Sequence, residues 1–333
     1  MRSGTVLAAV VALLVGGAAP VLVKLGTVAP DGSPWQQLLR EMDQEWQRIS
    51  GGAVTLRVYP GGVLGDETDL VKKLRIGQLH AVALSGAGME HLEPAVTCLQ
   101  LPLIFDTYEE LDHVRDRLAP MLEQSMAAKG YVVLNWSDAG WVMFFLKTPA
   151  ARPADIRKMK LFTSASDSRT LELYKAAGFR PVPLSVTDMQ SALQTGMIDA
   201  FDVPPLLALL NQWFPSAPNM VDVKWAPLVG ATVIGKKTWE RIPAELRPAL
   251  ARSAAELGVR YRARIRQMSD EAVTAMEKRG MRIIHTTEED RAAWRTEAEN
   301  AWPKLRGSVC PEAMFDEVVR LRGEYRAAHG GAP

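Results

Sequence analysis

The chain has 333 residues, of which 47% are hydrophobic, and this length favours two domains over a single core. Its 39 Lys and Arg and 38 Asp and Glu leave a formal net charge of +1. Such a balance supplies no field that attracts nucleic acid or an acidic membrane, so neither is expected as a partner.

The first nineteen residues have the pattern of a secretory signal peptide. A lone Arg2 precedes an apolar run from Val6 to Val15, and small residues follow up to Pro20. The apolar run is shorter than the ~20 residues that span a bilayer, which favours cleavage at about residue 19 over a membrane anchor. We therefore expect a periplasmic protein.

The sequence holds two cysteines, Cys98 and Cys310. Cys98 lies in the apolar run from Val96 to Ile104, which favours a buried small side chain over half of a disulfide. Export would permit a bridge, but we predict none.

The chain begins with a strand, a helix and a strand in series. Alternating apolar residues from Val21 predict the first strand, Ser33 and Pro34 begin a helix, and 54–59 alternates again. A further helix to Ile76 and a strand over 81–85 follow. This series predicts a parallel sheet.

The stretch from Asp155 to Pro205 predicts a ligand site. A short strand over 159–162 opens into the small polar run 163–166. A helix from Ser185 to Gln194 then leads to a second apolar strand over 197–201. Two strand ends should therefore face a common space.

Apolar residues near a 3.6-residue period predict one long helix from Arg247 to Arg279, with a break at Gly258 as the alternative. Roughly 30 helical residues would extend ~45 Å, more than one domain of this size needs. A strand over 281–285, a helix from Thr286 and a final amphipathic helix over 311–326 follow. The narrow apolar stripe of the final helix favours a monomer.

No motif of an enzyme, a metal site or a cofactor site is present in the sequence. The run from Gly230 to Thr238 is one residue from a phosphate-binding loop, but Lys237 stands where that loop needs a hydroxyl. The five histidines form no i,i+4 pair, and neither a GxSxG nor a CxxC motif occurs. We expect no catalysis, no metal and no cofactor.

Four short runs resemble the signature runs of one family, the DctP-type extracytoplasmic solute-binding proteins of TRAP transporters. They occur in the same order as in the family, and they are GGVLGDE from Gly61, LPLIF from Leu101, ALQTGMID from Ala192 and IPAELR from Ile242. One residue departs from the family pattern: His80 stands where the family usually carries Asp. The resemblance covers Val21 to about Ala328.

The resemblance implies a two-lobed α/β periplasmic binding protein fold of class II type. Each lobe would be a mixed sheet flanked by helices, and the long helix would span both. Lobe I would take 20–140 and 230–256, lobe II 141–229 and 257–305, and a C-terminal helix and tail 306–333. Hinge closure would capture a ligand for a small and a large integral membrane subunit.

The resemblance also implies an arginine that clamps the ligand's carboxylate, and Phe162 occupies that position. A family asparagine is replaced by Val203, and two further polar positions correspond to Val142 and Val28. A buried carboxylate without a cation costs several kcal/mol. We therefore expect an apolar or neutral ligand in a cleft lined by Val28, Ser85, Trp141, Val142, Phe162, Ser164, Phe201, Asp202, Val203 and Trp225.

Two alternatives remain open. Arg169 or Lys160 could replace the missing arginine, so that the protein binds a carboxylate after all. The same fold could also act as a ligand sensor or an interaction module without any transport.

Overall fold

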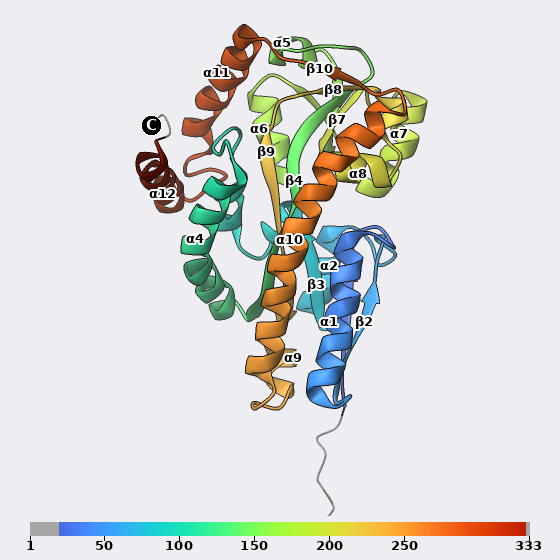
Figure 1. The fold of residues 1–333 in the computed structure, drawn as a ribbon, viewed down its shortest axis with the longest axis vertical. Coiled ribbons are helices and arrows are strands. Elements are labelled where there is room, and N and C mark those ends of the chain that lie inside the picture. The colour runs from blue at the N-terminus through green and yellow to red at the C-terminus, as the bar shows by residue number, and fades with distance from the viewer. Residues whose placement is uncertain (1–19, 331–333) are drawn as a thin grey trace, which may run out of the picture.

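The computed structural model describes residues 20–330. The predicted signal peptide lies outside these residues. The molecule has two lobes stacked along its long axis, and one 10-stranded sheet continues through both in the order β2-β1-β3-β9-β4-β7-β5-β6, with β8 and β10 at its side (Figure 1). The two-lobed α/β fold with a mixed, helix-flanked sheet is confirmed. None of the described helices is long and apolar enough to cross a membrane.

The lower lobe in Figure 1 is built on parallel strands, as the opening strand, helix and strand predict. β1 (Val21–Thr27) pairs in parallel with β2 (Val54–Tyr59) and with β3 (Ala81–Ser85). The crossovers contain α1 (Pro34–Ser50) and α2 (Glu67–Arg75). The hydroxyl of Ser33 accepts the N–H of Gln36 at 3.3 Å and so begins α1 at the predicted residue.

Two long antiparallel strands connect the lobes. β4 (Tyr131–Leu146) pairs with β9 (Ala226–Gly235), and β3 and β7 (Ala200–Val203) pair with them from either side. The register between β4 and β9 shifts between Asp138 and Trp141, beside Gly140 at φ +100°. A glycine is needed there because few other residues adopt this left-handed conformation.

The upper lobe contains the two strands whose ends should meet. β5 (Lys160–Ser164) pairs in parallel with β6 (Arg180–Leu184) and with β7. The short strands β8 (Asn219–Val221) and β10 (Arg282–Ile284) pair in parallel beside β4.

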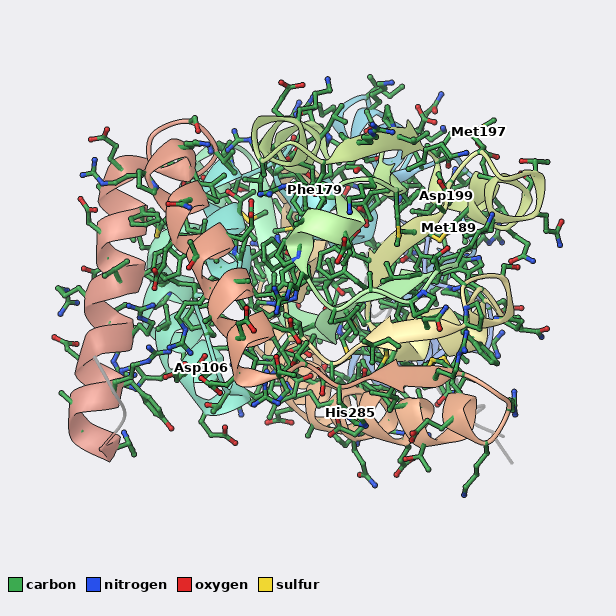
Figure 2. All side chains as sticks on the ribbon, turned by 90° about the horizontal axis from the view of Figure 1, so that it is seen from above. Asp106, Phe179, Met189, Met197, Asp199 and His285 are labelled. Atoms are coloured by element: carbon green, nitrogen blue, oxygen red, sulfur yellow. A yellow bond between two sulfur atoms is a disulfide. The ribbon has the colours of Figure 1, made fainter. Side chains whose placement is uncertain are left out.

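The second predicted strand begins three residues later than expected. Helix α7 (Met189–Thr195) ends at Gly196 in the left-handed conformation, and the N–H of Met197 returns to the carbonyl of Ala192 at 2.9 Å. Met197 is therefore 51% exposed at the rim of the molecule (Figure 2), and the strand starts only at Ala200. The helix also begins later than predicted, after a 3₁₀ turn over Val186–Asp188.

Helix α10 (Arg247–Glu277) is 31 residues long and continuous through Gly258. It runs along both lobes (Figure 1), as predicted. The remaining α-helices are α3 (Gly86–Met89), α4 (Tyr108–Ala128), α5 (Pro153–Ile156), α6 (Ser168–Ala176), α8 (Pro205–Leu210), α9 (Lys236–Arg241), α11 (Glu288–Leu305) and α12 (Glu312–His329).

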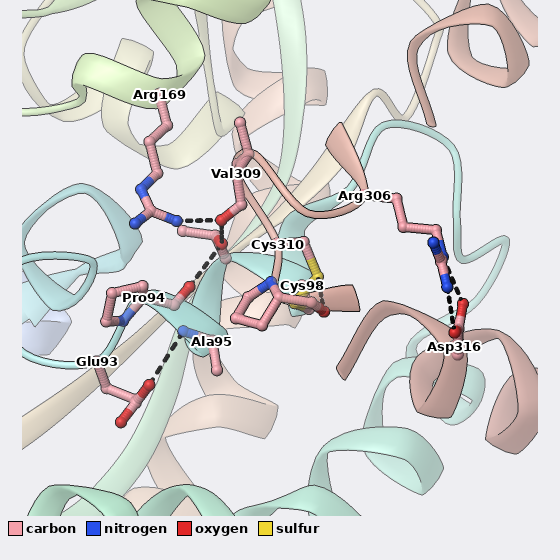
Figure 3. Close-up of a disulfide and its surroundings, with 11 residues drawn as sticks. Glu93, Pro94, Ala95, Cys98, Arg169, Arg306, Val309, Cys310 and Asp316 are labelled. Atoms are coloured by element: carbon pink, nitrogen blue, oxygen red, sulfur yellow. Dashed lines mark hydrogen bonds and ion pairs between the residues drawn. A yellow bond between two sulfur atoms is a disulfide. The ribbon is translucent and has the colours of Figure 1, made fainter. Parts of the chain in front are cut away.

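The C-terminal helix α12 packs on α4 of its own chain, where Arg326 pairs with Glu110 at 2.6 Å. The prediction of unpaired cysteines is wrong. Cys98, in the 3₁₀ segment Pro94–Gln100, forms a disulfide with Cys310, just before α12 (Figure 3). Cys98 is buried as expected, but the fold brings the Cα atoms to 5.2 Å, a separation that the sequence could not reveal.

Candidate functional site

A cavity of about 290 Å³ lies between the lobes, at the carboxyl ends of β1, β3, β5 and β7. Eight of the ten predicted site residues line it. They are Val28, Ser85, Val142, Phe162, Ser164, Asp202, Val203 and Trp225. Phe162 is 4% exposed, and its side chain packs in the same core cluster as Val203.

Trp141 and Phe201 pack in the core and do not line the cavity. Trp141 lies against Tyr108, with ring centroids 5.1 Å apart, because it points to the opposite face of β4 from Val142. Phe201 stacks on Phe145 at 4.9 Å, two residues further from the end of its strand than Val203. Phe144 packs in the core, whereas Trp213 reaches the cavity wall.

Neither proposed substitute cation reaches the cavity. Lys160 starts β5, at the far end of the strand from the cavity, and its amino group donates to the carbonyl of Gly196. Arg169 donates to the carbonyl of Val309 and lies 3.7 Å from Glu90. Within residues 20–330, no Lys, Arg or His lines the cavity.

Four acidic residues line the cavity instead, and only one has a basic partner. Asp138 pairs with Arg266 at 2.6 Å. Glu67 accepts the N–H and the hydroxyl of Ser85 at 2.6 and 2.7 Å, and burial raises the pKa of Glu67. The other three acids have no basic partner among the described residues.

The remaining two acids have neutral partners. Asp167 accepts the N–H of Thr170 at 2.8 Å at the start of α6, and burial raises its pKa. Asp202 accepts the hydroxyl of Tyr174 at 2.6 Å, and burial raises the pKa of Asp202 to about 7.

Two further polar side chains on the wall have no hydrogen-bond partner in the described chain. They are the amide of Asn135, which is 4% exposed, and the hydroxyl of Thr163, which is 2% exposed. Buried polar groups are almost always paired, so these two groups are available to a bound molecule or water.

Five polar residues of the wall were not predicted from the sequence, namely Glu67, Asn135, Asp138, Asp167 and Tyr174. Asn135 carried a signal, because it is a polar residue in an otherwise apolar strand, and Glu67 lies in a run shared with the resembled family. The sequence gives no such signal for Asp138, Asp167 and Tyr174, because their side chains reach the cavity only through the packing of separate elements.

Comparison with known proteins assigns the chain to a family. The family model of "Bacterial extracellular solute-binding protein, family 7", DctP, matches residues 25–307. The chain belongs to the DctP family. This is a family of solute-binding proteins, not of enzymes.

Relatives of this DctP-family chain are similar over most of their length. The C4-dicarboxylate-binding periplasmic protein DctP of Rhodobacter capsulatus is 26% identical over 284 residues, 83% of this chain and 84% of that protein. The 2,3-diketo-L-gulonate-binding periplasmic protein YiaO of Escherichia coli is 24% identical over 252 residues, 74% of this chain and 75% of that protein.

Solved structures share the fold of this DctP-family chain. The sugar acid binding protein DctPAm of Advenella mimigardefordensis, in complex with galactonate, superposes with a TM-score of 0.85 at 19% identity, covering 92% of this chain and 99% of that chain. A TRAP periplasmic solute-binding protein of Sulfurospirillum deleyianum with bound succinate gives a TM-score of 0.82 at 21% identity. The match covers 90% of this chain and 98% of that chain.

Proposed function

We propose that this protein is the periplasmic solute-binding subunit of a TRAP-type transporter, which captures a small molecule between its lobes. It closes by a hinge and delivers the ligand to the integral membrane subunits. Family membership and the interlobe cavity of about 290 Å³ support this proposal.

The ligand is not an organic acid and contacts the cavity mainly through apolar surface. The related proteins are named for acids or hold galactonate and succinate, and a buried carboxylate needs a cationic partner. In the described part of this chain, the wall offers no such cation, and Phe162 lies on it where the resemblance places the clamping arginine. The lining therefore favours a different ligand class from that of these relatives.

Calorimetry tests the ligand class. Protein stripped of co-purified ligand by unfolding and refolding is titrated with succinate, pyruvate and galacturonate. We expect no heat of binding at micromolar concentrations, because a buried unpaired carboxylate would lose several kcal/mol. Micromolar binding of any of the three acids would show that a cation reaches the ligand.

A pull-down tests delivery to a transporter. The exported protein serves as bait for detergent-solubilised membranes, and the recovered proteins are identified by mass spectrometry. A multi-spanning permease should be recovered. Recovery of a membrane-bound kinase or receptor alone would favour a sensor.

A further inference from the structure

One end of the cavity is a polar corner made by Asp202, Thr163 and Tyr174. β5 and β7 pair in parallel with Leu161 opposite Ala200, so Thr163 and Asp202, two residues further on, point to the same face of the sheet. Tyr174 of α6 closes the corner through its hydrogen bond to Asp202. All three residues line the cavity.

The hydrogen bonds of this corner are incomplete. Tyr174 donates to one oxygen of Asp202, and no other residue of the described chain donates to this carboxyl group. The Thr163 hydroxyl, buried and on the cavity wall, also has no partner between residues 20 and 330. The corner therefore presents unused acceptors at the wall of the cavity.

Among residues 20–330, no Lys, Arg or His pairs with the carboxyl of Asp202. The guanidinium of Arg266, which pairs with Asp138, also binds Asp112 at 2.7 Å. The nearby carboxyl of Asp167 has only neutral donors and adds negative charge at Asp202. A bound anion would be repelled here and a bound cation attracted.

We propose that the ligand carries a protonated amino group that binds Asp202 and Thr163, and an apolar body that packs on Phe162 and Trp225. An ammonium group has three donors and no acceptor, which matches a corner of acceptors. This inference rests on the proposed function, which requires a small molecule other than an organic acid in this cavity.

The size of the cavity limits the ligand to a small amine. At about 290 Å³, the cavity lies at the lower end of the ~300–1,000 Å³ range of small-molecule pockets. A primary amine of about ten non-hydrogen atoms, such as phenethylamine, matches this volume. 2-Phenylethanol and phenylacetate supply a neutral and an anionic analogue of similar shape.

Calorimetry with these three probes at pH 8 tests the proposal. Phenethylamine should bind about tenfold or more tightly than 2-phenylethanol, and phenylacetate should not bind. Asp202→Asn should weaken the amine about tenfold or more and change the alcohol less than about twofold. Asp188→Asn, an exposed residue of the same lobe that does not line the cavity, is the matched control and should bind like the original protein.

The pH dependence gives a second readout. The other titratable groups on the cavity wall are Tyr174 on α6, Asp167 just before α6, Glu67 on α2 and Asp138 on β4. Burial raises the pKa of Asp202 to about 7, so an ammonium ligand must displace its proton at lower pH. The affinity for phenethylamine should therefore rise up to about tenfold per pH unit from pH 5 to 7 and then level off. The same rise should be absent in Asp202→Asn.

Each other outcome has a distinct meaning. Equal affinity for the amine and the alcohol, no binding of the amine, or full amine binding by Asp202→Asn would each overturn the ammonium ligand and leave the proposed function in place. Tightest binding of phenylacetate would overturn both the ammonium ligand and the ligand class proposed above.

Discussion

At the scale of single residues, Asp202 is the side chain that most distinguishes this cavity. It occupies the end of β7 next to Val203, and its partner Tyr174 is neutral. An ionised carboxyl in such a place is costly, which is why its pKa rises to about 7. Proteins keep costly buried groups mainly where they serve a function.

This cost predicts a pH-dependent stability. The pKa of Asp202 rises on folding from 3.8 to about 7, so the native state holds the proton more tightly than the unfolded state. The contribution of Asp202 to the free energy of unfolding is therefore highest below pH 4 and falls as the pH rises to about 7. Asp202→Asn should be more stable than the original protein at pH 8, by on the order of 1–3 kcal/mol, and equally stable near pH 4.

Urea unfolding of the ligand-free proteins at pH 4, 6 and 8 measures this difference. A constant difference across the three pH values would mean that Asp202 stays ionised in the folded protein.

At the scale of elements, the crossing of α10 over β4 depends on one glycine. A Cβ atom at Gly258 would lie 2.6 Å from the Cβ of Asn135 and 3.2 Å from the carbonyl of Trp136. The helix therefore gains close packing on the strand that joins the lobes. This gain explains why a residue of low helix propensity lies inside a long helix.

Two glycine substitutions in helices should have opposite effects. Gly258→Ala should lower the free energy of unfolding by about 1–3 kcal/mol, because the methyl group would push α10 away from β4. Gly323→Ala in α12 is the matched control, since a Cβ atom there meets nothing within 4 Å. It should raise the free energy of unfolding by about 0.5–1 kcal/mol through helix propensity.

Thermal or urea unfolding of both variants gives the comparison. Stabilisation by both substitutions would show that α10 does not approach β4 this closely in solution.

At the scale of the whole molecule, a set of polar contacts joins the lobes on one side of the cavity. His91 donates to the carbonyl of Ser166 at 2.8 Å, and Ser168 donates to Glu90 at 3.3 Å. Arg169 donates to the carbonyl of Val309, next to the disulfide (Figure 3). These contacts would have to break before the lobes could separate.

Removing one of these contacts should favour an open form. Arg169→Ala would delete the donor to Val309 and the partner of Glu90, so small-angle scattering of the ligand-free variant should give a larger radius of gyration. Lys175→Ala, an exposed residue of the same helix, is the control and should leave the radius unchanged. Identical scattering of both variants would argue against hinge opening at this side.

The disulfide should contribute strongly to stability. It closes a loop across 212 residues, and removal of a native bridge typically costs 2–5 kcal/mol. Adding a reductant should lower the melting temperature of the original protein. The Cys98→Ser and Cys310→Ser double variant should melt at that lower temperature, and the reductant should not change its melting temperature. No change on reduction would mean that the two sulfur atoms are not bridged in solution.

The sequence by itself predicted the features that depend on neighbours along the chain. The hydroxyl of Ser33, the proline at the start of α1 and the 3.6-residue period of α10 act within a few residues, so they located helices correctly. Short runs shared with the DctP family predicted the two-lobed fold. Eight of the ten residues that they placed at the ligand site do line the cavity, because strand ends meet at one edge of a sheet.

Only the tertiary structure decided the chemistry of the cavity. Val203 reaches the cavity wall and Phe201 does not, because Val203 lies at the end of the strand next to the cavity. Cys98 meets Cys310 only because α12 packs against the rest of the chain. Arg169 and Lys160 are held away from the cavity by the carbonyls of Val309 and Gly196, which are distant in sequence. The acids of the cavity wall also come from separate segments of the chain. Charge and hydrogen bonding act through space, so the balance of a buried site appears only when distant segments have been brought together.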